Sequence, residues 1–261
     1  MRPNGVEKQV RPIERPDIDQ YSLKGSKSAP LSWPHWIAVS PDKSKLYLVQ
    51  ASWYVYQYWM TGGDITTLTA AQSNTSTSIN SRWLYCKSDG TKLYSVADGW
   101  QRATITMPTP FSLSSSTVSS TTASLWISSP TWCWFTPDGN YVFICSCSSP
   151  RAVYKAPLTT AWDMSTATST WMTSVSTTSA QWTYPYNVAI SPSWKKMFIW
   201  TYYNSTSISQ FNLTTPRDIT TATYSWKYMS VSERWEFTVA PDGTLYLTNA
   251  NSSTTIYQYW A

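Results

Sequence analysis

Residues 40–48 read Ser40-Pro41-Asp42-Lys43-Ser44-Lys45-Leu46-Tyr47-Leu48, and this stretch decides the fold because the chain repeats it. From the position of Pro41, the later copies follow at steps of 47, 49, 55 and 49 residues. A repeat period near fifty residues is typical of β-propellers and solenoids. The four further copies lie at 87–94, 136–143, 191–198 and 240–247.

Each copy has the same internal order. A short apolar run, 36–39 in the first copy, precedes the Pro-Asp turn, whose Asp and Gly residues favour a tight hairpin. Strand-like runs follow at 45–49 and 54–59, and a fourth, rich in Ser and Thr, begins at an Asp-Ile pair such as Asp64-Ile65. Four antiparallel strands make one propeller blade, in which we expect the apolar first strand to line the central channel.

The two ends of the chain complement one another. The fifth copy stops after its third strand, at 255–260, without an Asp-Ile element. Near the start, Asp17-Ile18 leading to Tyr21-Ser22 resembles Asp218-Ile219 and the residues after it, so residues 17–23 are expected to form a strand. Pairing this N-terminal strand with 255–260 would close a ring and leave no free sheet edge. The sequence therefore predicts an all-β fold, a five-bladed β-propeller over residues 16–261. It is preceded by an extended arm at residues 1–15, for which a disordered terminus is the alternative.

The composition agrees with this fold and excludes some partners. The chain has 17 Trp and 18 Tyr but only 13% charged residues, which suits half-buried strand surfaces. The net charge of +5 comes from scattered residues, and because no Lys/Arg stripe follows the repeat we expect no nucleic-acid partner. No apolar run approaches transmembrane length and no secretory signal follows Met1, so we expect no membrane insertion.

The reactive residues do not form a recognisable catalytic or metal-binding pattern. Cys86, Cys133, Cys145 and Cys147 lack metal-ligand spacing, and His35 is the single histidine, so we expect free buried thiols, no metal site and no cofactor. Most acidic residues recur at one repeat position, which is typical of a turn or strand-entry role rather than catalysis. One histidine without a nucleophile elbow does not make a Ser-His-Asp triad. We therefore expect no catalytic residues.

Binding is better supported than catalysis. Pairs of aromatic and polar residues precede each inner strand and would form a collar at one mouth of the channel, where we expect the best pocket. Trp faces would stack on sugar rings, while Arg82, Asn187 and Glu236 would supply hydrogen bonds. The alternative is that these aromatics pack between neighbouring blades. The candidate collar comprises His35, Trp36, Arg82, Trp83, Trp132, Tyr186, Asn187, Trp235 and Glu236.

Two segments carry a resemblance to a known class of repeats. Residues 213–222, Leu-Thr-Thr-Pro-Arg-Asp-Ile-Thr-Thr-Ala, and 158–167, Leu-Thr-Thr-Ala-Trp-Asp-Met-Ser-Thr-Ala, are its best matches. With the repeated turn, they resemble the degenerate propeller-type repeats of phage and marine-virus tail-fibre, head-fibre and structural proteins, over about residues 15–261. The sequence departs from the pattern at Ser193, which replaces Asp, and around Phe111, where no Asp-Ile pair stands. These departures leave the geometry of two turns open.

The resemblance implies a virion structural protein without catalysis: a fibre, tail or capsid decoration subunit on the virion surface, made in the host cytoplasm without a signal peptide. Its N-terminal arm would contact other virion proteins or further copies of the chain as a homo-oligomer, and its collar would contact host surface glycans. Two alternatives stay open. One is a propeller-type enzyme such as a lactonase or lyase, which would need a metal or convergent carboxylates in the channel. The other is a bacterial surface interaction module.

Overall fold

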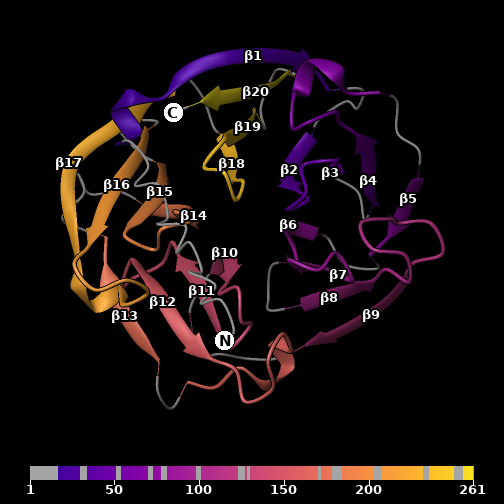
Figure 1. Cartoon of the computed structure of the whole chain (residues 1–261). Helices are drawn as coiled ribbons and strands as arrows, with labels where there is room; N and C mark the ends of the chain where they lie inside the picture. Colours follow the sequence, from indigo (N-terminus) through magenta and orange to yellow (C-terminus); the bar gives the residue numbers. More distant parts are fainter. Residues whose placement is uncertain are drawn as a thin grey trace, which may run out of the picture.

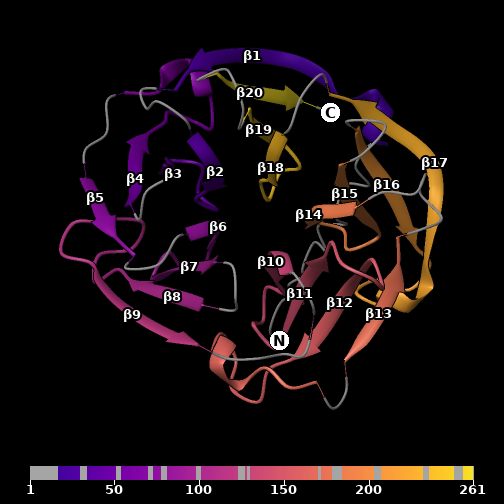
Figure 2. The same ribbon diagram turned by 180° about the vertical axis from the view of Figure 1, so that it is seen from behind.

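The protein is a ring of five antiparallel sheets. The computed structural model describes residues 17–29, 34–50, 54–69, 73–77, 81–97, 101–122, 127, 130–169, 172–177, 184–202, 207–231, 235–249 and 255–260. They form five four-stranded sheets that stand around a central axis (Figures 1 and 2). Helix in the described part of the chain is confined to 3-10 turns of three residues. The predicted all-β, five-bladed propeller is confirmed, whereas the predicted arm at residues 1–15 lies outside the described residues.

In the first four blades, the strands run outward from the channel in chain order. The first blade consists of β2 (Pro34–Val39), β3 (Lys45–Gln50), β4 (Tyr54–Trp59) and β5 (Ser73–Ser76). The second consists of β6 (Ser81–Cys86), β7 (Lys92–Ala97), β8 (Gln101–Thr106) and β9 (Thr117–Thr122). The third consists of β10 (Pro130–Phe135), β11 (Tyr141–Ser146), β12 (Ala152–Pro157) and β13 (Thr173–Ser176). The fourth consists of β14 (Tyr184–Ile190), β15 (Lys196–Tyr202), β16 (Ser207–Leu213) and β17 (Ala222–Ser230).

The fifth blade joins the two ends of the chain. Its inner strands are β18 (Trp235–Val239), β19 (Leu245–Asn249) and β20 (Thr255–Trp260), and its outer strand is β1 (Ser22–Ser28). β1 pairs antiparallel with β20, from Ser22 opposite Trp260 to Ser28 opposite Thr255. Figure 1 shows β1 along the outer edge of this blade, beside β20. The predicted closure of the ring is therefore confirmed.

The Asp-Ile elements were predicted as the starts of fourth strands, and this was wrong. They form the 3-10 turns η1 (Ile18–Gln20), η2 (Ile65–Thr67), η4 (Met164–Thr166) and η5 (Ile219–Thr221). In η2 the Asp64 carboxylate accepts a hydrogen bond from the backbone N–H of Thr66 at 2.9 Å, a cap that favours a helical turn over a strand. Ile65 is completely buried, so the element plugs a gap between blades before the outer strand begins.

A glutamine in the third strand fastens a blade to this plug in the next blade. Its side-chain oxygen accepts the backbone N–H of the buried apolar residue, and we call this contact the glutamine latch. The pairs are Gln57 with Leu113 at 2.7 Å, Gln210 with Ile18 at 2.8 Å and Gln258 with Ile65 at 3.2 Å. Each latch joins residues far apart in the chain and buries its polar atoms. Together the three latches tie the first blade to the second, the fourth to the fifth and the fifth to the first.

The Pro-Asp turns have the predicted geometry. Gly139 adopts φ 72°, the left-handed conformation that favours glycine. At the turn that departs from the repeat, the backbone N–H of Trp194 donates to the backbone carbonyl of Ser191 at 2.8 Å. The N–H of Lys43 donates to the carbonyl of Ser40 in the same way. Ser193 therefore leaves the turn intact. The other departure is also accommodated, since buried Leu113 takes the place of the plug residue.

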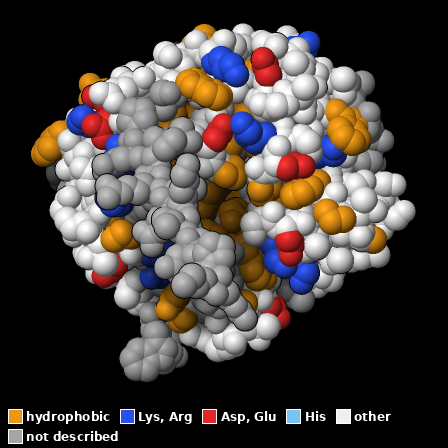
Figure 3. All heavy atoms as spheres, in the orientation of Figure 1, with side chains coloured by type: hydrophobic (Ala, Val, Ile, Leu, Met, Phe, Trp, Pro, Cys, Tyr) orange, Lys and Arg blue, Asp and Glu red, His pale blue; other side chains and the backbone are white. Residues whose placement is uncertain are grey.

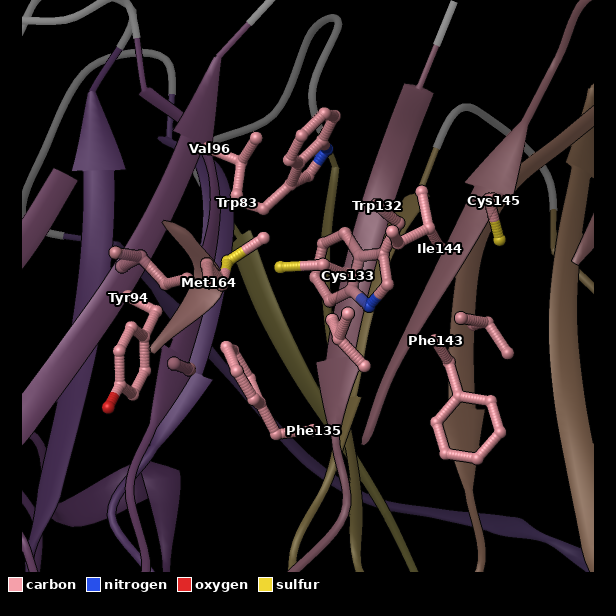
Figure 4. Packing of buried hydrophobic residues seen from close by; sticks show 14 of the residues in the cluster. Trp83, Tyr94, Val96, Trp132, Cys133, Phe135, Phe143, Ile144, Cys145 and Met164 are labelled. Carbon is pink, nitrogen blue, oxygen red and sulfur yellow. The ribbon is translucent and has the colours of Figure 1, made fainter. Parts of the chain in front are cut away.

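The core lies between adjacent blades. Figure 4 shows Trp83, Trp132, Cys133 and Cys145 among the side chains that fill it. Cys86, Cys133 and Cys145 are buried free thiols, as expected, and burial raises the pKa of Cys133 to about 12. Cys147 is only partly buried, so the expectation of burial was wrong for this residue. None of the described helices has the length and hydrophobicity that crossing a bilayer requires.

Candidate binding site

A cavity of about 310 Å³ opens at one end of the central channel, where the inner strands meet the Pro-Asp turns. Figure 3 shows a hollow with hydrophobic side chains near the middle of one face, with acidic and basic side chains around it. All five blades contribute to the cavity, which we call the turn-side mouth. Its walls include Ala38, Val39, Pro41, Leu84, Tyr85, Cys86, Ser88, Trp134, Phe135, Pro137, Ile190, Pro192, Trp194, Thr238, Val239, Ala240 and Pro241.

The walls of the turn-side mouth are apolar and aromatic. The ring of Tyr85 meets Trp134 edge to face, with centroids 5.3 Å apart, and burial raises the pKa of the Tyr85 hydroxyl. As the described residues define it, the lining contains no Asp, Glu, Lys, Arg or His. Its few hydroxyl groups, on Ser88, Tyr85 and Thr238, provide directional contacts. This arrangement suits an apolar or aromatic group better than a charged one.

The carboxylates near the mouth serve the turns. Asp42 accepts the N–H of Ser44 at 3.0 Å, and Asp242 takes an ion pair at 2.7 Å from Lys43 in the neighbouring blade. Although partial burial opposes it, a hydrogen bond from Lys87 helps to lower the pKa of Asp89 to about 2. The expectation that the repeated acids act as turn devices is therefore confirmed for these residues. They remain ionised and occupied at neutral pH.

The predicted collar lies at the other end of the inner strands. Val39 lines the turn-side mouth, and Trp36 lies three residues earlier in β2, about 10 Å away along the strand. Trp36, Trp83 and Trp132 are 7%, 3% and 1% exposed, which favours the alternative that they pack between blades. The side chains of the three remaining collar residues at the strand starts lie outside the described residues; they are His35, Arg82 and Trp235.

Two polar collar residues meet in the interior. Asn187 of β14 and Glu236 of β18 are buried, with the Asn187 amide nitrogen 3.3 Å from a Glu236 carboxylate oxygen and 2.9 Å from the Phe237 carbonyl. Tyr186 packs edge to face on Trp200 at 5.6 Å. The two Asn187 contacts join the fourth and fifth blades, and the Tyr186 contact lies within the fourth. The structure thus brings Asn187 and Glu236 together, whereas Trp36, Trp83 and Trp132 lie on three separate blades.

Sequence reasoning missed the turn-side mouth. The prolines that line it, Pro41, Pro137, Pro192 and Pro241, recur with the repeat and were interpreted only as turn residues. Their recurrence was a usable signal, because five turns at the same height in a ring must converge on the axis. At the collar, the register of β2 shifts between Pro34 and Trp36, a bulge that sequence did not indicate.

The described residues offer no obvious metal donor set. No group of three or more His, Cys, Asp and Glu side chains comes together among them. Glu236, the acidic residue of the inner strand β18, lies beside the Asn187 amide.

Several solved structures share the fold. The β-propeller domain of Cps50 (Swd1) from Myceliophteria thermophila aligns with a TM-score of 0.54 at 8% identity, over 87% of this chain and 82% of that one. A candidate 6-phosphogluconolactonase from Bacteroides uniformis aligns with a TM-score of 0.50 at 14% identity, over 85% and 66%. Another from Bacteroides fragilis aligns with a TM-score of 0.50 at 11% identity, over 83% and 77%. No protein-family model and no curated protein sequence matches the chain. By its fold, this chain is a five-bladed β-propeller.

Proposed function

We propose that this protein is a structural subunit of a virus particle, a fibre, tail or capsid decoration protein, that works by binding rather than by catalysis. The resemblance of its repeats to those of phage structural proteins supports this proposal. So does the ring itself, since latches between blades suit a rigid disc that presents one face to a partner.

The turn-side mouth is the observation that carries the binding role. A volume of about 310 Å³ is at the small end of ligand pockets, and it suits one aromatic or aliphatic side chain. Apolar pockets that receive a single aromatic anchor are typical centres of protein–protein interfaces. We infer that the occupant is an apolar side chain of another virion protein. The N-terminal arm at residues 1–15 remains a second proposed contact with the particle.

A propeller-type enzyme, such as a lactonase or lyase, is the alternative from a different class. Two of the similar structures are candidate 6-phosphogluconolactonases, but identities of 14% and 11% indicate a shared fold alone. Against catalysis, the carboxylates described at the mouth are occupied by turn hydrogen bonds and an ion pair. A bacterial surface interaction module is the third possibility, which particle microscopy separates from the first.

The mouth is tested with small probes. Indole and p-cresol imitate aromatic side chains, and N-acetylglucosamine and galactose imitate glycans. We expect indole or p-cresol to bind the full chain with a Kd of about 1 mM. The binding is measured by NMR titration. Ser88→Trp should block the mouth and abolish this binding, because Ser88 is exposed on the lining. Ser169→Trp, at an exposed serine away from the lining, is the matched control and should leave binding unchanged.

The outcomes separate the candidates. Sugar binding that Ser88→Trp abolishes would replace the protein anchor by a glycan, and no binding of any probe would overturn the role of the mouth. The virion assignment is tested separately by immunogold electron microscopy of particles from the sample that carries the gene. Labelling at regular positions on the particles is expected, and labelling of cell surfaces instead would favour the bacterial module.

A further inference from the structure

Arg102 is a buried charge at a position where every other blade has an apolar residue. It lies on β8 opposite Val96, is 3% exposed, and corresponds by register to apolar residues that are all completely buried. These residues are Val55, Val153, Ile208 and Ile256. All three guanidinium nitrogens lack a hydrogen-bond partner among the described residues. Because an unpaired buried charge is strongly unfavourable, Arg102 calls for a partner that supplies negative charge.

The junction between the second and third blades also lacks the glutamine latch. Thr104 stands in β8 where the first blade has Gln57, since each lies opposite the second-strand tyrosine of its blade. A threonine is too short to reach the plug of the next blade. The tyrosine itself differs as well: Tyr47 donates to the Phe111 carbonyl at 3.0 Å, whereas the hydroxyl of Tyr94 is buried without a partner among the described residues.

A cavity of about 390 Å³ occupies the place of the missing latch. Arg102, Tyr94 and Thr104 line it from the second blade, and Trp162 and Asp163 line it from the third. Figure 4 shows Tyr94 near Met164, the plug residue of this junction. The rings of Tyr94 and Trp162 stack with centroids 6.2 Å apart, which gives the cavity an aromatic wall. The cavity therefore combines apolar surface with hydrogen-bond donors that have no acceptor.

The charges at the cavity favour an anion. Lys92 and Arg102 are basic, and Asp163 is the acidic residue of the lining. One oxygen of the Asp163 carboxylate is occupied, because it accepts from the N–H of Ser165 at 2.8 Å and from its hydroxyl at 2.6 Å. The carboxylate attracts the Arg102 charge but accepts no hydrogen bond from it. No ion pair joins it to Arg102 among the described residues. One positive charge therefore remains in excess, on a guanidinium whose planar fork matches a carboxylate or phosphate.

We propose that the cavity between the second and third blades binds a small organic oxyanion, a carboxylate or phosphate compound, through the guanidinium of Arg102 and the hydroxyl of Tyr94. The ligand takes the place of the glutamine latch that three of the other four junctions have, and it fastens the two blades. Its apolar part lies against Trp162. This site is separate from the turn-side mouth and does not depend on the virion role.

The experiment measures anion binding to the full chain by calorimetry and by the shift in Tm, at constant ionic strength with chloride as the reference. The probes are inorganic phosphate, acetate and benzoate. We expect at least one to raise Tm relative to chloride, since a ligand that binds only the folded state stabilises it. A preference for phosphate or for the two carboxylates identifies the class of the natural ligand.

Three variants locate the site. Arg102→Val introduces the residue that the first blade has at this position, Val55, so the variant should fold. It should bind the anion about 100-fold more weakly, because the charged donors are removed. Arg102→Lys keeps the charge but loses the fork, and it should bind with intermediate affinity. Arg151→Val is the control for the loss of one positive charge elsewhere, since Arg151 lies outside the cavity, and it should bind as the wild type does.

Thr104→Gln supplies a test that does not remove the arginine. The longer side chain should restore the latch, raise Tm in chloride and abolish the response to the anion. The proposal is overturned if none of the probes shifts Tm or gives binding heat with the wild type. It is also overturned if Arg102→Val and Thr104→Gln both fold and both keep wild-type affinity.

Discussion

At the scale of single residues, the ring depends on buried hydrogen bonds between blades. Gln57 is 2% exposed, and its side-chain oxygen accepts the N–H of Leu113 at 2.7 Å in the next blade. A buried backbone N–H that loses its acceptor costs about 1–3 kcal/mol, whereas an exposed one is satisfied by water. The latch is therefore a stability determinant that a single substitution can remove.

Gln57→Leu should lower the free energy of unfolding by about 1–3 kcal/mol, because the Leu113 N–H is left without an acceptor. Gln101→Leu makes the same chemical change at an exposed position of β8 and should alter stability by less than about 0.5 kcal/mol. Urea denaturation of both variants and the wild type gives the comparison. Equal losses for the two variants would argue against the latch.

Little of this residue-level detail could be predicted from the sequence. Gln57, Gln210 and Gln258 recur with the repeat, but their partners lie in the next blade, where no local pattern indicates them. The contrast at Arg102 was readable in principle, because aligned third strands have Val or Ile at that position. The absence of a partner for its guanidinium required the coordinates.

At the scale of elements, the Asp-capped turn that precedes β1 anchors the start of the ring. Gln210 donates to the Asp17 carboxylate at 2.8 Å, Lys227 forms an ion pair with it, and Lys196 lies 2.9 Å away. The hydrogen bond from Gln210, followed by that from Lys227, holds the pKa of Asp17 well below its usual range. η1 and β1 are thereby fastened to the fourth blade as well as to β20.

Asp17→Asn should destabilise the protein at neutral pH by about 1 kcal/mol or more, and this loss should depend on pH. The pKa of Asp17 is lower in the folded state, so between the two pKa values the unfolded chain binds more protons. The stability that Asp17 contributes is therefore complete above about pH 5 and is lost progressively as the pH falls below about 4. The difference in stability between wild type and variant should therefore shrink as the pH is lowered from about 5 to about 3, which thermal unfolding measures.

Asp19→Asn is the control for this prediction, because Asp19 is exposed and lies 3.9 Å from Lys227. An exposed ion pair of this kind contributes little to the free energy of unfolding. The substitution should therefore leave the pH dependence of stability unchanged. A constant difference between wild type and Asp17→Asn from pH 7 to pH 3 would contradict the proposed role of Asp17.

The elements show where pattern reasoning succeeds and fails. Apolar runs before each Pro-Asp turn correctly predicted the inner strands, since burial on both faces leaves a continuous signal. Asp64-Ile65 was assigned to a strand because its apolar residue begins a Ser/Thr-rich run. The preference of Asp for helix N-caps was the competing signal, and in the structure Asp64 caps the 3-10 turn η2.

At the scale of the whole molecule, the repeat count and the two ends of the chain were enough to predict a closed ring of five blades. The site was less accessible to sequence reasoning. The collar was placed at the start of the inner strands, whereas the described cavity lies at their other end, because packing between blades buries Trp36, Trp83 and Trp132. The residue types indicated which side chains are suited to binding a ligand. They did not indicate which of those side chains remain exposed once the blades pack together.

Closure of the ring is the central claim, since the latches, the mouth and the anion cavity all require blades fixed around one axis. Ser26 of β1 lies opposite Tyr257 of β20, so Ser26→Cys with Tyr257→Cys should form a disulfide on mild oxidation. Ser22→Cys with Tyr257→Cys is the control, because Ser22 pairs with Trp260 instead, about 10 Å further along the strand. Both pairs are made in a Cys147→Ser background.

The measurement is the yield of the intramolecular disulfide in the folded protein, read by non-reducing electrophoresis and mass spectrometry. We predict a nearly complete disulfide between positions 26 and 257 that raises Tm, and little bond formation for the control pair. Equal yields for the two pairs, or no bond in either, would contradict a ring closed by β1 against β20.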